Sequence, residues 1–417
     1  MPLLPLIEPV VYGLLAGTLL SQQLRDVSAV ALLALLVWER FTRDVDESTQ
    51  PLSWSWVVTV AGFLAANLLS AWVSADRDAS FEQLRFYPLG LLIFLGTRRV
   101  VGAGRWRSLA VVVLAMVAVF STDTIWQWFH GQSFLRDRAP LWGRFQGSLV
   151  YPSDVSLLPI LLPIGGAIVL EGGRWRIAVA IAAVALVAAA ASLSGTRSAW
   201  VGLLCIVAAA GWTQRRAALG VAMLAIIIAV SVLAARGSTT TAVGRLFSAR
   251  AYRAEKRLVQ WQAAIMLFRE APILGNGPHS FRRIVRARHG EKSVVGRVEL
   301  DYAPYPHNIY LEALCGTGAV GCVALLALLA RGLTGLYRRR DHPIARAALT
   351  SLGALAAIGF FDLSLVKDWV QLCLWLPLGI ASASESLPRY DSSREAPISA
   401  DRAGADGAEP AAQTPPR

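Results

Sequence analysis

Apolar runs close to the thickness of a bilayer dominate the chain, and short polar segments separate them. A helix of roughly 17–25 apolar residues crosses the hydrocarbon core of a membrane. Such runs must be helical, because every backbone N–H and C=O group in hydrocarbon needs an internal partner. The pattern therefore predicts an all-α, polytopic integral membrane protein with about twelve transmembrane helices. They lie near residues 4–22, 26–41, 53–74, 84–97, 107–130, 153–171, 175–193, 198–214, 217–235, 309–331, 343–363 and 367–385.

The transmembrane runs form two blocks, residues 1–235 and 309–385, and a long polar loop at 236–308 separates them. Within this loop, Arg250–Pro272 carries apolar residues along one helical stripe and ends in proline, which predicts an amphipathic helix. Residues 386–417 are rich in Pro, Ala and Asp and predict a disordered tail. The first run lacks the basic region and cleavage site of a signal peptide, so we expect it to be retained as a helix.

Composition supports a membrane protein and argues against a metal site. The chain is 55% hydrophobic and 16% charged, with a mean hydropathy of +0.49, whereas soluble domains carry about 25% charged residues. The four cysteines lie in or beside apolar runs and lack metal-ligand spacing, which indicates buried small hydrophobes. Asp, Glu and His form no group with convincing metal spacing either, so we expect no metal and no other cofactor.

The net charge of +12 comes almost entirely from arginine. In a soluble protein this balance would suggest nucleic-acid binding, but here arginines fill short loops that the positive-inside rule assigns to the cytoplasm. These loops contain Arg98, Arg99, Arg105, Arg107, Arg174, Arg176, Arg215, Arg216, Arg338, Arg339 and Arg340. Both termini are then cytoplasmic, and residues 131–152 and 236–308 lie on the opposite, outer side. The arginines of these two outer segments either follow from the tolerance of long loops for charge or bind an anionic ligand.

Arg197 lies in a short outer turn, SLSGTRSAW, between two apolar runs. It is either an arginine that extends to the membrane interface or part of an anion site. The second interpretation is favoured, because a short outer turn gains nothing from a cation under the positive-inside rule. Ser194 and Thr196 add hydroxyl donors, and the helix that Arg197 begins directs its positive dipole end to the same place.

His307 stands directly before an apolar run, in PYPHNIYLEALCGTGAVG. It either anchors the start of a helix or acts as a general base, a role that suits histidine near neutral pH. Asn308 can cap the helix or orient the imidazole. Glycines 316, 318 and 321 predict the close approach of another helix. His279, in the turn GNGPHS, is a second candidate.

Four motifs in order resemble the family of O-antigen ligases and polymerases. The first is Arg144, Gly147 and Tyr151-Pro152, although a histidine is common in the family where Tyr151 stands. The other three are Ser194-Gly195-Thr196-Arg197; Arg257, Trp261, Pro272, Gly275 and Gly277; and His307-Asn308 with Gly318 to Gly321. Each motif is weak by itself, but all four fall on the outer side that the loop charges predict.

The resemblance implies a GT-C-like, metal-independent glycosyltransferase of the bacterial inner membrane, with its active site on the periplasmic side. The donor would be an O-antigen linked to undecaprenyl diphosphate, and the acceptor lipid A–core. The family's basic residues correspond to Arg197 and Arg257, which would stabilise the departing diphosphate, and to His307, which would deprotonate the acceptor. Arg144, Arg138, Ser194, Thr196, Asn308, Trp261 and His279 are then expected to contact the substrates.

Several functions remain open from the sequence. An O-antigen ligase is the first hypothesis. A repeat-unit polymerase of the same family has nearly the same pattern, and a protein O-glycosylating transferase is a third enzyme of this kind. A lipid-linked glycan flippase or transporter would instead require ionisable groups at mid-membrane and an internal repeat, and the sequence shows few such groups and no convincing repeat.

Overall fold

The computed structural model describes residues 3–42, 51–74, 76–171, 174–213, 252–289, 294–295, 298–299 and 305–387. In these ranges the fold is helical apart from one hairpin, in which β1 (Val294–Val295) pairs antiparallel with β2 (Val298–Glu299). The all-α prediction is therefore confirmed for the described part of the chain. The tail from residue 388 and the predicted ninth run at 217–235 lie outside it.

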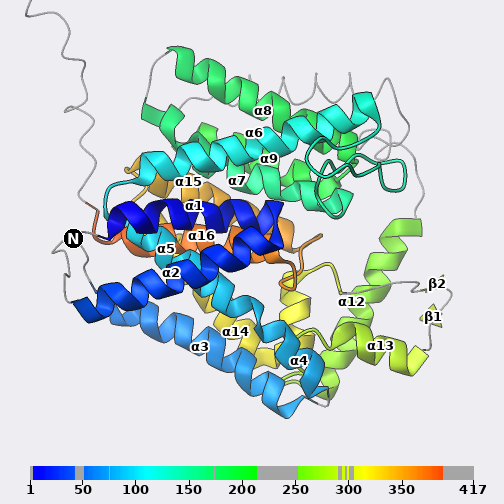
Figure 1. The fold of residues 1–417 in the computed structure, drawn as a ribbon. Coiled ribbons are helices and arrows are strands. Elements are labelled where there is room, and N and C mark those ends of the chain that lie inside the picture. Colours follow the sequence, from blue (N-terminus) through cyan, green and yellow to red (C-terminus); the bar gives the residue numbers. More distant parts are fainter. Residues whose placement is uncertain are drawn as a thin grey trace, which may run out of the picture. The chain divides into compact units, whose positions relative to one another are not determined.

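The helices are arranged as Figure 1 shows. In chain order they are α1 (Leu4–Leu20), α2 (Gln22–Thr42), α3 (Trp54–Val73), α4 (Arg77–Leu84), α5 (Phe86–Gly102), α6 (Trp106–His130), η1 (Pro152–Ser156), α7 (Leu157–Gly165), η2 (Gly166–Glu171), α8 (Arg174–Ser194), α9 (Arg197–Thr213), α12 (Tyr252–Glu270), α13 (Phe281–His289), α14 (Ile309–Arg338), α15 (Pro343–Gly359) and α16 (Asp368–Ser384).

Each predicted apolar run within the described ranges coincides with helical structure, and the amphipathic helix predicted at Arg250–Pro272 is α12. Among the residues that the structure describes, four helical stretches are long and apolar enough to cross a membrane: Trp54–Val73, Trp106–His130, Pro152–Val169 and Ile309–Arg338. The shorter apolar helices include Leu4–Leu20, Ala178–Ser194, Arg197–Ala210 and Pro343–Gly359. The chain is thus a multi-helix membrane protein, and the count of about twelve spans stays a prediction.

Helix α16 is the buried centre of the bundle. It packs against α5, α15 and α14, and its side chains from Trp369 to Ser384 are all buried. Trp375 lies edge-on to Phe63 and Phe94, and Gly90 of α5 makes room for it, since a Cβ there would lie 2.2 Å from the indole nitrogen. On the outside, α2 and α3 expose many large apolar side chains, as expected for helices that face lipid.

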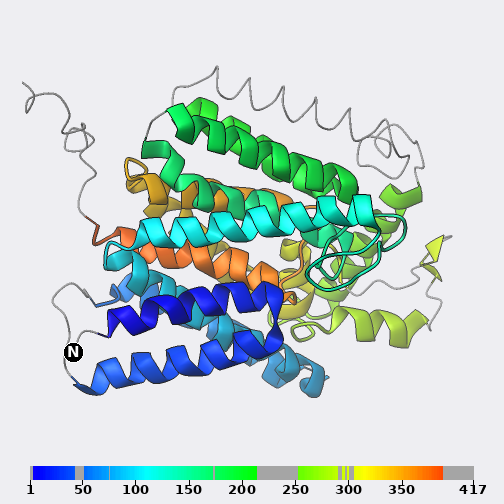
Figure 2. The same ribbon diagram turned by 45° about the horizontal axis from the view of Figure 1, so that its top comes forward.

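The two ends of α16 carry different chemistry. At its C-terminal end, Arg98 donates to Ser382 (3.1 Å) and Arg339 to the Glu385 carbonyl (2.9 Å). At its N-terminal end, Lys367 meets Asp154. The basic loops predicted to be cytoplasmic and the elements predicted to be periplasmic therefore lie at opposite ends of one helix. Helices α12 and α13 and the irregular segment after α6 lie toward the right in both Figure 1 and Figure 2.

The glycines of α14 make room for a turn, which differs from the helix contact that the sequence predicted there. Helix α14 is interrupted at Gly318, where φ is 67° and ψ is −167°. The turn that follows α12 pairs with this break: Ala319 N–H donates to the Pro272 carbonyl and Gly277 N–H to the Gly316 carbonyl, both at 2.8 Å. A Cβ at Gly275 would lie 2.3 Å from the Gly316 oxygen. The turn that contains Pro272, Gly275 and Gly277 thus connects α12 to α14 through backbone hydrogen bonds.

Candidate active site

Asp362 joins the candidate site residues. It lies in the segment 360–367, which connects α15 to α16. Its carboxylate is 7% exposed, and it contacts Arg257 (3.2 Å), His307 Nδ1 (3.2 Å) and the Ser198 hydroxyl (2.6 Å). Burial alone would raise the pKa of the Asp362 carboxyl, but the hydrogen bond with His307 and the charge of Arg257 outweigh it and lower the pKa. Asp362 is therefore an anion that holds three separate segments together.

Helix α12 carries Arg257 and Trp261 to the same place. Arg257 donates to the Phe361 carbonyl as well as to Asp362, and its side chain remains 38% exposed. These contacts use two of the five N–H donors of a guanidinium group. One turn further along, the Trp261 indole N–H donates to the Pro306 carbonyl (3.2 Å) and fixes the residue before His307. Arg257 thus binds the Asp362 carboxylate, whereas Trp261 fixes the backbone before His307.

His307 is held in an unusual backbone conformation beside α14. Its φ is +56°, a region that non-glycine residues rarely adopt and that often marks functional sites. Its ring lies 4.5 Å from that of Tyr305 and is 24% exposed. Asn308 accepts hydrogen bonds from the N–H groups of Tyr310 and Leu311, both at 3.0 Å, and so caps α14. The capping role considered from the sequence is therefore confirmed, and substrate contact by Asn308 stays a prediction.

Arg197 begins α9, next to Ser198, and its side chain is exposed. Because Ser198 donates to Asp362, the start of α9 lies at the same junction as Arg257 and His307. Two of the three predicted catalytic residues, Arg257 and His307, thus contact one carboxylate. Arg197 lies next to a third contact of that carboxylate, Ser198.

The hydroxyl-rich turn before Arg197 is tied to the segment after α6. Arg144 donates to the Ser194 carbonyl (2.5 Å) and to the Thr196 hydroxyl (3.1 Å). Thr196 in turn donates to the Pro152 carbonyl (2.5 Å). Ser194 and Thr196 are buried. These bonds show that the first two motifs form one unit, in which Arg144 positions the turn.

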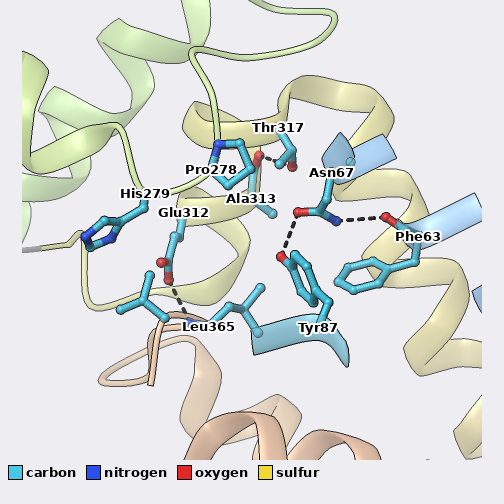
Figure 3. Close-up of a pocket in the computed structure, with 11 residues that line it drawn as sticks. Phe63, Asn67, Tyr87, Pro278, His279, Glu312, Ala313, Thr317 and Leu365 are labelled. Atoms are coloured by element: carbon cyan, nitrogen blue, oxygen red, sulfur yellow. Dashed lines mark hydrogen bonds between the residues drawn. The ribbon is translucent and has the colours of Figure 1, made fainter. Parts of the chain in front are cut away.

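Three residues that the sequence analysis singled out make contacts other than with Asp362: Arg138, Tyr151 and His279. The Arg138 carbonyl accepts from Ser133 N–H (2.9 Å) and the Gln127 amide (2.8 Å), which fixes the backbone after α6. Tyr151 stacks on Trp142 (ring centroids 6.4 Å apart). His279 lines a small cavity of about 30 Å³ beside Glu312, together with Tyr87 and Asn67 (Figure 3). The structure does not bring His279 into the Asp362 junction.

Figure 3 also shows how the connecting segment is anchored to α14. The buried Glu312 carboxylate accepts from the Ser364 hydroxyl (2.8 Å) and from the Leu365 N–H (3.1 Å). The Asn308 amide donates to the Phe360 carbonyl (3.1 Å). Anchors on both sides of Asp362 therefore fix its position.

A second buried ion pair lies beside the junction. Lys367 contacts Asp154 at 2.6 Å, and their side chains are 12% and 3% exposed. Burial alone would lower the pKa of Lys367, but the Asp154 charge outweighs it and raises the pKa. The Lys367 ammonium also lies 5.4 Å from the Tyr305 ring, which itself contacts His307. One aromatic ring thus separates this pair from the candidate base.

Sequence reasoning missed Asp362, Lys367, Asp154 and Glu312. The available signal was an aspartate and a lysine in a connection of only eight residues between two apolar runs, where ionisable groups are costly and often functional. The sequence prediction placed Asp362 inside the apolar run 343–363, whereas α15 ends earlier, at Gly359, and leaves Asp362 in the connection.

The arrangement is suited to binding an anion and removing a proton from a neighbouring group. It offers guanidinium donors, an imidazole and a helix N-terminus within one site. Within the ranges that the structure describes, three or more His, Cys, Asp or Glu side chains nowhere gather as potential metal ligands.

Comparison with known families agrees with the motifs. A family model described as O-antigen ligase matches residues 181–326. This range contains the turn before Arg197, helix α12 with Arg257, and His307 with the first part of α14; Arg144 and Asp362 lie outside it. None of the curated proteins matches the chain. Residues 181–326 are therefore similar to the O-antigen ligase family, the same family that the sequence motifs resemble.

Proposed function

We propose that the protein transfers an O-antigen glycan from undecaprenyl diphosphate to lipid A–core, at the periplasmic face of the bacterial inner membrane. The observation that carries this proposal is the junction at Asp362, which joins Arg257, His307 and the start of α9. A lipid diphosphate is the leaving group that such cations suit, because negative charge accumulates on its oxygens as it departs. The match to the O-antigen ligase family supports this substrate class.

The hydrogen bond between His307 and Asp362 assigns the roles of the two imidazole nitrogens. A carboxylate can only accept, so Nδ1 carries the proton and donates it to Asp362. Nε2 is then the basic nitrogen, as a general base requires. Nε2 takes the proton of the acceptor hydroxyl while the oxygen attacks the anomeric carbon. The bond to the diphosphate breaks, and its electron pair leaves with the lipid diphosphate, which inverts the anomeric centre.

Asp362 stabilises the imidazolium that this step creates, and Arg257 and Arg197 stabilise the diphosphate. Arg257 is fixed by its bonds to Asp362 and Phe361, so its remaining donors keep a defined direction. Such preorganised donors need no rearrangement as the charge develops. The residues therefore accomplish the transfer by positioning and electrostatics, without a step that requires a metal.

A repeat-unit polymerase uses the same chemistry with a second lipid-linked glycan as the acceptor, and gene disruption with lipopolysaccharide analysis separates the two. A ligase defect leaves lipid-linked polymer but no long O-antigen on lipid A–core, whereas a polymerase defect leaves core with one repeat unit. A transporter would give neither pattern in a reconstituted system, because it forms no glycosidic bond.

The base assignment is tested in proteoliposomes with purified donor and acceptor. We expect His307→Ala to lower the rate by about 10²–10⁴-fold, the usual contribution of a general base. His130→Ala is the matched control, because His130 is exposed and stacks on Trp126. A His307→Ala rate within a few-fold of the wild-type rate would refute the assignment.

A further inference from the structure

A cavity of about 370 Å³ lies next to the Lys367–Asp154 pair. Its wall combines the turn between α1 and α2, the end of the irregular segment after α6, and the start of α16. The volume falls within the range of about 300–1,000 Å³ that is usual for small-molecule sites. Of the four sequence motifs, the first reaches this cavity through Tyr151, and the residues that line the cavity lie outside the family match.

The charged groups of the cavity are arranged in pairs. Lys367 contacts Asp154, and Arg25 contacts Asp368. Arg136 donates to the carbonyls of Leu19 and Leu20 at the end of α1. Each cation therefore stands beside an acceptor, and the cavity presents paired donors and acceptors.

This pairing of cations with carboxylates favours a polyhydroxylated ligand over an anion. A sugar hydroxyl both donates and accepts, so it can bridge an ammonium and a carboxylate at the same time. A phosphate would meet Lys367 and Arg25 but would also approach Asp154 and Asp368. Trp369, in the cavity wall, adds a buried indole N–H that has no hydrogen-bond partner in the described ranges, and a sugar oxygen would supply an acceptor.

The cavity also lies close to the candidate base. Lys367 is 5.4 Å from the centre of the Tyr305 ring, and that ring is 4.5 Å from the His307 ring. Tyr151, another residue of the wall, lies 5.6 Å from the Lys367 ammonium. We propose that this cavity binds saccharide rings of the acceptor, with Lys367 and Asp154 holding their hydroxyls. The proposal rests on the proposed function, because it assigns the acceptor to one side of His307.

The first test fills the cavity without touching its charged groups. Val150 lies in the wall and is 49% exposed, so Val150→Trp places a large ring at the opening. We expect the KM for lipid A–core to rise at least ten-fold, while the KM for the lipid-linked donor stays within two-fold. Val111→Trp, at an exposed valine of α6, is the matched control and leaves both values unchanged. A rise in the donor KM alone, or no change in either KM, would overturn the proposal.

The second test measures binding without turnover. The probe is deacylated core oligosaccharide, titrated into the protein in nanodiscs. Lys367→Gln with Asp154→Asn removes both charges together, so that neither is left buried without its partner. We expect this double variant to weaken binding at least ten-fold and the control His130→Ala, at an exposed histidine that stacks on Trp126, to leave it within two-fold.

The binding test also separates the two proposals. If the wild type binds the oligosaccharide but transfers no glycan, the proposed function fails and the saccharide site stands. If it transfers glycan but the double variant binds the oligosaccharide as tightly as the wild type, the saccharide site fails. If inorganic phosphate displaced the bound oligosaccharide, the cavity would be an anion site, and the proposal would also be refuted.

Discussion

Asp362→Asn is the most direct test of the junction, because it changes a carboxylate into an amide of the same shape. In the native protein the carboxylate accepts from His307 Nδ1 at 3.2 Å and from Ser198 at 2.6 Å. The asparagine amide can rotate to present its NH₂ group to the imidazole, so that Nδ1 becomes the acceptor and the ring proton moves to Nε2. The base would then be lost, which costs about 10²–10⁴-fold in rate.

A second loss acts on Arg257, whose guanidinium no longer faces an ionised partner. Hydrogen bonds to charged groups contribute about 1.5–3 kcal/mol. Because Arg257 is 38% exposed, solvent screening reduces the loss toward or below the lower end of this range. We therefore expect the kcat of Asp362→Asn to fall nearly as far as that of His307→Ala, with only a modest loss of thermal stability.

The assay is transfer in proteoliposomes, with kcat and each KM measured and with folding checked by thermal unfolding. The double variant His307→Ala/Asp362→Asn should lose little more than His307→Ala, because the two residues act as one unit. Asp341→Asn, an exposed aspartate just after α14, is the control. If the two single losses multiplied in the double variant, or if Asp362→Asn kept a third of the wild-type kcat, our reasoning would be wrong.

Further predictions follow from the same contacts. Arg257→Lys keeps the charge but loses the planar fork, so transfer should fall at least about ten-fold, and near-full activity would contradict bidentate binding. Gly275→Ala places a Cβ 2.3 Å from the Gly316 oxygen at a φ of +69° and should lower stability by about 1–3 kcal/mol, whereas Gly353→Ala meets open space in a helix and should raise Tm. Because the pKa of Asp362 is lowered, its stabilising effect is present above the ordinary aspartate value and is lost only as pH falls through the folded value. The stability difference between the wild type and Asp362→Asn should therefore persist above about pH 4 and shrink below it. Transfer should also persist in a chelator, and loss of activity that a divalent cation restores would refute a metal-independent site.

The sequence was sufficient for the features that depend on local pattern. Apolar runs predicted the helices, because a chain in hydrocarbon must satisfy its own backbone groups. The spacing of Arg257 and Trp261 predicted that both lie on α12, one turn apart. The predicted run 153–171 is not one continuous helix but a succession of η1, α7 and η2, with Pro152 at its start and Pro163 within α7. Proline has no N–H to donate, so it disrupts the regular ladder.

Long-range pairing was beyond the reach of the sequence. Nothing near Asp362 in the chain indicates that it meets Arg257, His307 and Ser198, because these residues come from three distant segments. The glycines of α14 were recognised as small residues for close packing, but whether a helix or a turn fills the space depends on how the chain returns from α12. Lys367 and Asp154 likewise become a pair only after α16 has packed into the bundle.

In the proposed mechanism, the charge of the junction determines how the catalytic work is divided. The positive charge of Arg257 and the negative charge of Asp362 cancel, and His307 is neutral while it acts as a base. The junction by itself therefore exerts little net attraction on a diphosphate, and Arg197 must supply much of that attraction at the start of α9. If His307 takes the acceptor proton as proposed, the junction becomes cationic beside the leaving lipid diphosphate. Positive charge thus appears there as negative charge develops on the leaving group, which favours the transition state over the bound substrate.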